Sequence, residues 1–370
     1  MKFIAIQSNI KEAISTVAAA TGENTNLPIL KNVLIKAANG IVDFIATNLE
    51  IGTTYHITGK VLEEGSLTVP ISLLQNIINN IKSDRLNFET KGAALEIKTD
   101  NYSATIQGVS PEDFPPTPKI KNPESYLEIK GVFLKDAIQQ VDAAAQASDF
   151  RPELSSIYFN FSLETLKLAA TDGFRLAEKT IPANNFTVKN QESFTMLLPL
   201  KSAYEVLRFV KDEDMVKIYF DDNQVLIKTE HVELISRLIE GNFPDYAAII
   251  PKKFICEIVV DVDELLSGIK LASVFGQKNG EVEIKVLPNK KTIEIVSADQ
   301  SLGENAYLLP AKIKGEPIQV AFNWRYLVDP LKTIRTKEVL LGFQEEANPA
   351  AIRPASDGSY FYIIKPILRA

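Results

Sequence analysis

The chain offers few side chains for acid–base, nucleophilic or metal chemistry. It contains two histidines, His56 and His231, and one cysteine, Cys256. Each lies in a strand-like run without a catalytic neighbour, so we expect structural or surface roles for the histidines and a buried packing role for Cys256. The sequence has no G-x-S-x-G elbow, H-E-x-x-H motif, Walker loop or dinucleotide fingerprint. This pattern favours a protein that is not an enzyme and that uses no metal or other cofactor.

Carboxylates are the remaining candidates for chemistry. Asp221-Asp222 leads into Asn223, which is more typical of a hairpin turn than of a metal site, and Glu63-Glu64-Gly65 likewise indicates a solvated turn. A hydrolase or nuclease that uses scattered carboxylates is the alternative from a different functional class. Metal-dependent cleavage that disappears on changing Asp172 or Asp221 would support it.

Internal repetition is the strongest pattern in the chain. Thr47 in Ile-Ala-Thr-Asn and Thr171 in Ala-Ala-Thr-Asp are 124 residues apart. Pro28 and Pro152, which belong to a second pair of similar motifs, are also 124 residues apart. A weaker third copy, Val-Ser-Ala-Asp, ends at Asp299. Two independent motifs at one offset predict tandem repeats.

Each repeat combines amphipathic helices with strands. Apolar residues at three-to-four spacing predict six helical segments, two in each repeat: 8–21, 71–85, 134–149, 200–214, 262–279 and 324–338. Pro330 lies inside the last segment, and we expect it to kink or split that helix near Asp329. Alternating runs after each helix predict strands, for example at 31–36, 157–161 and 281–286. Two helices on a largely antiparallel sheet would give each repeat an α+β fold.

Proline-rich joints separate the repeats. Glu112 to Pro118 and Gly241 to Tyr246 both contain Phe-Pro, at places where one pattern ends and the next begins. The simpler explanation is a loop that happens to contain Phe-Pro. Because the joints recur at the repeat spacing, we predict three domains, at 1–120, 121–247 and 248–370.

Composition limits the class of protein. At 370 residues the chain is too long for one ordinary core, and 45% hydrophobic with 24% charged residues is typical of a globular protein. No apolar run approaches the roughly 18 residues of a membrane span. The alternating start, Met1 to Ile6, predicts a first strand and not a signal peptide. With a single cysteine, these features indicate a cytoplasmic protein that does not bind membranes.

The net charge of −7 argues against ordinary nucleic-acid binding, which favours basic proteins. The six predicted helical segments, however, carry equal numbers of basic and acidic residues, so the rest of the chain carries the whole negative charge. A helical layer that faces a polyanion would have this asymmetry. Ordinary solvated helix faces would produce it as well.

A series of ordered motifs resembles one family along the whole chain. The motifs are 25–30 (TNLPIL), 46–52 (ATNLEIG), 112–115 (EDFP), 170–177 (ATDGFRLA), 236–246 (SRLIEGNFPDY), 321–327 (AFNWRYL) and 362–366 (YIIKP). They resemble the β subunit of bacterial DNA polymerase III, the sliding-clamp family. The resemblance implies three tandem clamp-type repeats that form half of a closed, head-to-tail homodimeric ring, with helices lining the hole. Such a ring holds double-stranded DNA by encirclement, so it needs only weak phosphate contacts.

The resemblance also implies an apolar groove between repeats II and III. In this family the groove captures clamp-binding motifs of the replicative polymerase, the clamp loader and repair polymerases. The corresponding residues here are Leu154, Thr171, Gly173, Phe174, Arg175, Leu176, Pro244, Ile249, Asn323, Tyr326, Ile363, Pro366 and Ile367. Apolar anchors would fill a pocket, while Arg175, Asn323 and Tyr326 would supply orienting polar groups. The alternative is that Leu154, Leu176 and Ile363 simply belong to the core.

This sequence departs from the family in the groove. Phe174 stands where histidine is usual, and Lys365 stands where methionine precedes the proline. The first repeat has Leu49-Glu50-Ile51 in place of Phe174-Arg175-Leu176, which assigns docking to the middle repeat.

Three further expectations concern surfaces and assembly. Candidate DNA contacts are Lys82, Arg85, Arg151, Lys201 and Arg208. Candidate dimer contacts are Ile106 and Val274. A monomeric clamp-like scaffold that does not bind DNA is a third hypothesis, which retention on circular DNA would distinguish.

Overall fold

The computed structural model describes residues 1–22, 26–148, 150–190, 192–276, 280–299 and 301–368. The chain forms two compact units, which share the predicted middle repeat between them. Unit 1 comprises Met1–Val132, Phe186–Gln191 and Lys201–Leu238. Unit 2 comprises Phe133–Asn185, Glu192–Leu200 and Ile239–Ala370. No helix among the described residues is long and apolar enough to cross a membrane.

A nine-stranded antiparallel sheet forms the larger layer of unit 1. Its strands in spatial order are β14 (Phe186–Lys189), β10 (Tyr126–Lys130), β16 (Met215–Asp221), β17 (Gln224–Lys228), β18 (Val232–Arg237), β4 (Ile51–Thr58), β3 (Ile41–Thr47), β2 (Asn32–Ala38) and β6 (Gly65–Pro70). The pairing of β18 with β4, from Val232↔Tyr55 to Ser236↔Ile51, joins the first and middle repeats by backbone hydrogen bonds.

A five-stranded sheet and the two contacting helices of the first repeat also belong to unit 1. The strands are β5 (Lys60–Glu63), β1 (Lys2–Ile6), β7 (Arg85–Lys91), β8 (Ala94–Lys98) and β9 (Ser103–Gln107), and the helices are α1 (Gln7–Ala18) and α2 (Ile71–Asn80). Alternation in β1 buries Phe3, whose ring stacks on Phe88 at 4.7 Å. Ile10 and Ile14 of α1 are also buried, so the predicted helical face is the core face.

Unit 2 has a second nine-stranded antiparallel sheet. Its order is β15 (Phe194–Pro199), β11 (Ser156–Phe161), β12 (Thr165–Thr171), β13 (Arg175–Pro182), β27 (Tyr360–Ile364), β26 (Ala350–Pro354), β25 (Glu338–Phe343), β19 (Cys256–Asp261) and β23 (Lys312–Gly315). Here β13 pairs with β27 from Arg175↔Ile364 to Lys179↔Tyr360, which joins the middle and last repeats.

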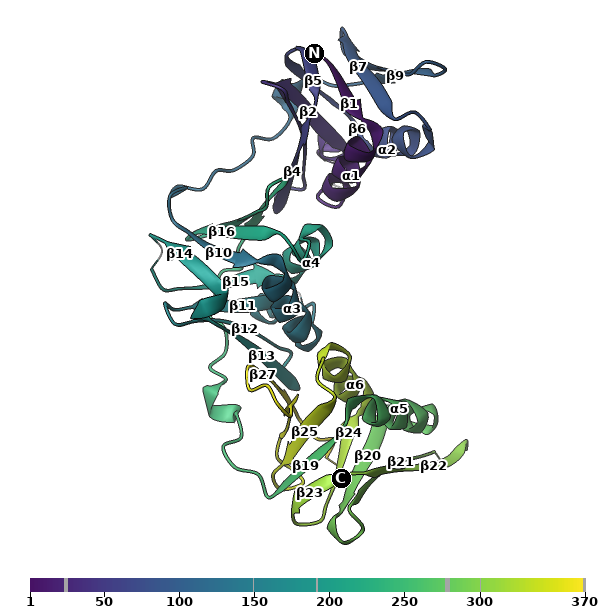
Figure 1. Cartoon of the computed structure of the whole chain (residues 1–370), viewed down its shortest axis with the longest axis vertical. Coiled ribbons are helices and arrows are strands. Elements are labelled where there is room, and N and C mark those ends of the chain that lie inside the picture. Colours follow the sequence, from purple (N-terminus) through teal and green to yellow (C-terminus); the bar gives the residue numbers. More distant parts are fainter. Residues whose placement is uncertain (23–25, 149, 191, 277–279, 300, 369–370) are drawn as a thin grey trace. The chain divides into compact units, whose positions relative to one another are not determined.

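A four-stranded sheet lies in the rest of unit 2, in the order β22 (Gly303–Pro310), β21 (Thr292–Asp299), β20 (Glu281–Leu287) and β24 (Ile318–Asn323). Helices α5 (Val262–Ala272) and α6 (Trp324–Thr333) contact each other, and α5 packs on β21 and β22 (Figure 1). The other two helices, α3 (Gly131–Val141) and α4 (Leu200–Phe209), span the divisions between the units. The prediction of six helices on antiparallel sheets is confirmed for the part of the chain that the structure describes.

The predicted helices extend too far at their C-terminal ends. For example, α2 ends at Asn80 because Ile81 is extended, and β7 begins at Arg85. Residue 149 and residues 277–279, which two predictions included, lie outside the described residues. Of the two effects predicted for Pro330, a kink or a split, the split is wrong, since α6 is continuous through this residue. Proline removes a single hydrogen bond from this ten-residue helix, which ends three residues later.

Candidate functional site

The corner between β12 and β13 is fixed by its own side chains. The Thr171 hydroxyl donates to the Arg175 carbonyl at 2.6 Å and accepts from the Gly173 amide at 3.1 Å. One Asp172 carboxylate oxygen accepts from the Phe174 and Arg175 amides, both at 2.9 Å. Gly173 has φ of +87°, which glycine adopts without strain.

The corner between β3 and β4 has the same hydrogen bonds. Thr47 donates to the Ile51 carbonyl at 2.9 Å, and Asn48 accepts from the Glu50 and Ile51 amides at 3.0 and 2.8 Å. Leu49 takes the glycine position, with φ of +78°. The expected alignment of Leu49-Glu50-Ile51 with 174–176 is therefore shifted by one, and Ile51 is the counterpart of Arg175.

Arg175 is held between two carboxylates and an aromatic ring. Its Nε donates to Asp172 at 2.9 Å, and its Nη1 donates to Asp329 on α6 at 2.6 Å. The guanidinium carbon lies 4.2 Å from the centre of the Tyr326 ring, within the range of a cation–π contact. The Arg175 side chain is 13% exposed, so these contacts are largely removed from water. The predicted groove residues Thr171, Arg175 and Tyr326 are thus brought together.

The side chains of this corner lie on two faces of the β13–β27 ladder. Leu176 pairs with Ile363, and both are buried in a cluster that Tyr246, Ile250, Phe254 and Phe361 cover. Since neighbouring residues of a strand alternate between faces, Arg175 points to the opposite face, where Tyr326 and Asp329 contact it. Leu176 and Ile363 are 1% and 3% exposed, which is the burial expected of core residues.

The C-terminal segment continues alongside the same corner. The Lys365 amide donates to the Phe174 carbonyl at 2.9 Å, and the Ile367 amide donates to the Ala321 carbonyl at 2.8 Å. Pro366 and Ile367 are therefore held between the corner and the strand that leads into α6. Phe174 is 60% exposed and presents an aromatic surface to solvent.

The other predicted groove residues differ from one another in burial and in the element on which they lie. Leu154 is buried in a short 3-10 helix, Pro152–Ser155, and Ile249 is 48% exposed at the end of another, Ala247–Ile249. Pro244 is half-buried next to Phe243, which stacks on Tyr158 at 4.8 Å. Asn323 caps α6 by accepting from the Arg325 amide at 3.0 Å. The side-chain oxygen of Asn323 and the guanidinium of Arg175 are thus already engaged within the chain.

Comparison with known proteins decides which family has this arrangement. The DNA polymerase III beta subunit N-terminal, central and C-terminal domains match residues 1–118, 128–245 and 247–368. The chain belongs to the DNA polymerase III beta subunit family. It is a replication processivity clamp, a non-catalytic class of protein.

Similar clamps align along their full length. The beta sliding clamp of Synechococcus elongatus is 25% identical and that of Bacillus subtilis 26% identical, each with 99% of both chains covered. A crystal structure of the DNA polymerase sliding clamp from Bacillus subtilis superimposes with a TM-score of 0.95 at 25% identity, covering 100% of both chains. The DNA polymerase III beta subunit from Thermotoga maritima gives 0.90 at 26% identity, again over 100% of both chains.

The candidate DNA contacts of this clamp are all exposed, but they lie on different kinds of element. Lys82 lies in the loop after α2, and Arg85 begins β7. Arg151 precedes a 3-10 helix and pairs with Glu153 at 3.1 Å. Only Lys201 and Arg208 lie on a helix, α4, so the helical location expected for Lys82 and Arg85 is wrong.

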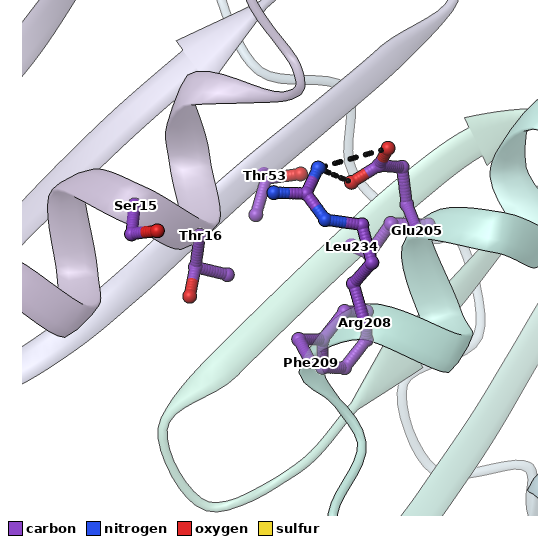
Figure 2. Close-up of a pocket in the computed structure, with 7 residues that line it drawn as sticks. All are labelled: Ser15, Thr16, Thr53, Glu205, Arg208, Phe209 and Leu234. Atoms are coloured by element: carbon purple, nitrogen blue, oxygen red, sulfur yellow. Dashed lines mark hydrogen bonds and ion pairs between the residues drawn. The ribbon is translucent and has the colours of Figure 1, made fainter.

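Arg208 lines a cavity of about 240 Å³ between α1 and α4 in unit 1 (Figure 2). Its guanidinium donates to Glu205 at 3.0 and 3.2 Å, and Ser15, Thr16 and Thr53 line the opposite wall (Figure 2). The ion pair neutralises the charge of this arginine locally. The charge of Arg208 is therefore balanced within α4, in contrast to that of an unpaired cation.

The cysteine and the two aspartates that were candidates for chemistry are buried or engaged in hydrogen bonds of the fold. Cys256 is fully buried in β19, and burial raises the pKa of its thiol to about 11. Asp172 is committed to the β12–β13 corner, while Asp221 is buried and accepts from the Lys121 amide at 3.0 Å. No group of three or more His, Cys, Asp or Glu residues that could hold a metal ion occurs in the described ranges.

Sequence reasoning missed Asp329 as a partner of Arg175. The two residues are 154 positions apart, so no local pattern links them. A weak signal existed, because Asp329 follows Tyr326 by three residues and therefore shares its helix face.

Proposed function

We propose that two copies of this clamp close head to tail into a ring that encircles duplex DNA. The observation that supports the ring is the division of each nine-stranded sheet into five strands of one repeat and four strands of the repeat before it. In unit 1, five strands ending at β18 meet four that begin at β4; in unit 2, five ending at β27 meet four that begin at β13.

The two smaller sheets consist of one further set of five strands and one further set of four strands. The five-stranded sheet ends at β9, which has the place of β18 and β27 in its repeat. The four-stranded sheet ends at β22, which has the place of β4 and β13. Pairing β9 of one copy with β22 of the other would form a third nine-stranded sheet of the same kind. A repeated head-to-tail contact of this type closes a ring when its rotations add to a full turn.

Apolar side chains flank both end strands. Tyr102 and Val109 are 40% and 43% exposed beside β9. Val274, Leu302 and Leu308 are 60–66% exposed at or near β22. Val274, a predicted dimer contact, thus remains a candidate. Ile106, the other, is 1% exposed within its own sheet and has no free side chain to contribute.

Encirclement reconciles DNA binding with the net charge of −7. A closed ring stays on DNA because it surrounds the duplex, so it does not need strong phosphate contacts. Weak contacts also permit the ring to slide. Lys82, Arg85, Arg151, Lys201 and Arg208 stay our candidates for these contacts. We assign the three repeats to 1–120, 121–247 and 248–370, and we place the protein in the cytoplasm, where the chromosome is replicated.

The deciding experiment is retention on nicked circular DNA, loaded by the clamp loader of the same organism. We expect loss of the protein when the circle is linearised, and light scattering should give twice the 41.0 kDa chain mass. Equal retention on both forms would disprove encirclement. A monomer without retention on either form would support the clamp-like scaffold instead.

The corner at Thr171 to Leu176 and the C-terminal segment at Lys365 to Ile367 form the partner site in this proposal. Exposed Phe174 and Ile249 would contact short motifs of the replicative polymerase, the clamp loader and repair polymerases, next to the buried cluster that contains Leu176 and Ile363. Leu154, Gly173, Pro244, Asn323, Tyr326, Pro366 and Ile367 complete the proposed groove.

A further inference from the structure

Arg175 is not required for the fold of its corner. The β3–β4 corner has the same threonine and Asx hydrogen bonds, yet Ile51 stands at the position of Arg175. The arginine must therefore serve something that the first repeat lacks. What the first repeat lacks is the proposed partner site.

The contacts of Arg175 limit what it can do there. Asp172 is 2% exposed and Asp329 26% exposed, so two carboxylates balance one guanidinium in a poorly hydrated setting. Lys332 lies 3.8 Å from Asp329 but is 58% exposed, and its charge is screened by water. The local charge around the guanidinium is thus not positive. An arginine with this environment would attract an acidic partner side chain only weakly.

Geometry shows what the ion pairs achieve. Nε and Nη1 are directed to carboxylates on the corner and on α6, and the guanidinium plane is thereby fixed over the Tyr326 ring at 4.2 Å. A planar cation with several donors can join two carboxylates and an aromatic face at once, whereas the point charge of lysine cannot. Removing the Asp329 carboxylate would leave Asp172 as the one remaining ion-pair partner of the guanidinium and would hold the guanidinium over the ring less firmly.

We propose that Asp329 is a positioning residue of the partner site. It holds Arg175 against Tyr326, so that the site binds its partner through apolar and backbone contacts and not by attracting an acidic side chain. This inference rests on the proposed docking function. It specifies the partner as a segment with apolar anchors whose affinity does not depend on carboxylates.

The test uses the full-length dimer and fluorescent peptides tiled across the replicative polymerase of the same organism. The tightest peptide is made in two forms, one native and one with each Asp and Glu replaced by its amide. We expect the two forms to bind wild type within about twofold of each other. Asp329→Asn and Arg175→Lys should each weaken both forms by about tenfold, since each breaks a charge-assisted hydrogen bond.

Asp263→Asn, which removes an exposed carboxylate from α5, is the matched control and should bind as wild type does. The double variant Asp329→Asn, Arg175→Lys should bind the peptide about as tightly as either single variant does, because both substitutions act through one contact. Unchanged affinity in Asp329→Asn, or a tenfold preference for the native peptide over the amide form, would overturn the proposal.

A crystal structure of the Asp329→Asn dimer gives a readout that needs no partner. We expect the guanidinium more than about 6 Å from the Tyr326 ring, beyond cation–π range, with the Thr171 hydrogen bonds unchanged. A guanidinium still stacked on Tyr326 would overturn the positioning role. If wild type binds no peptide, the docking function itself fails, and this structure still decides whether Asp329 positions Arg175.

Discussion

His56 Nδ1 lies 2.7 Å from an Asp43 carboxylate oxygen, directly across the β3–β4 pair. On the other side of β4, Glu233 of β18 lies 3.7 Å from Nε2. One histidine therefore bridges two carboxylates at the junction of the first two repeats. The Asp43 hydrogen bond and the nearby Glu233 raise the pKa of His56 to about 9.

This pKa makes the junction pH-dependent. A histidine whose folded pKa exceeds its unfolded value of about 6.5 stabilises the fold fully below that value and loses the effect as pH rises through about 9. We expect His56→Gln to lower the free energy of unfolding by about 1–3 kcal/mol near pH 6 and by much less near pH 10. Chemical denaturation across this range measures it.

His231→Gln is the control, because this second histidine is exposed. Its effect should stay below about 0.5 kcal/mol at both pH values. A His56→Gln penalty that does not change with pH would show that the ion pair does not contribute.

Tyr326→Ala and Arg175→Ala should weaken partner-peptide binding and leave the dimer intact. Each removes one half of the cation–π contact at 4.2 Å, and neither residue lies on a terminal strand of a sheet. We expect a loss of about tenfold or more, as for a buried aromatic or arginine anchor. Fluorescence polarisation measures affinity and light scattering measures mass. Unchanged peptide affinity in both variants would move the docking site elsewhere.

The corner could be predicted from sequence because its chemistry is local. Thr47 and Thr171 recur at one spacing, and both donate to a carbonyl four residues later. The presence of each helix was also predictable, because its apolar residues recur at helical spacing. Helix ends were not, since periodic apolar residues such as Ile81 continue beyond the last helical turn.

Long-range partners were beyond sequence reasoning. Nothing near Arg175 indicates that Ile364 pairs with it or that Asp329 binds it, because both contacts depend on how β27 and α6 are placed. For the same reason, the sharing of two sheets between repeats was not predicted. The family resemblance placed Arg175 and Tyr326 in one groove but carried no information on which charges surround them.

Val274→Lys should convert the dimer to a monomer. Val274 is 66% exposed beside β22, so a charge there would not disturb the single chain but would be buried without a partner in the proposed seam. Sedimentation at several concentrations measures the change. Leu163→Lys, at a residue 69% exposed in the β11–β12 connection, is the matched control and should remain a dimer. A dimeric Val274→Lys would exclude this residue from the interface.

Cys256 should be inert in the folded protein. It is fully buried between β23 and β25, and its thiol pKa of about 11 leaves little thiolate at pH 8. A disulfide exchange reagent should therefore label it only after denaturant is added. Rapid labelling of the native protein would show that β19 opens readily.

The strand pairs β18–β4 and β13–β27 have a consequence for anyone who divides this chain for expression. A fragment that stops at residue 120 would keep β4 but lose β18, and would expose a long row of backbone donors and acceptors. Such strands recruit one another, so the fragment should aggregate. The joined repeats thus cover each other's strand edges, and a repeat expressed alone would leave such an edge open.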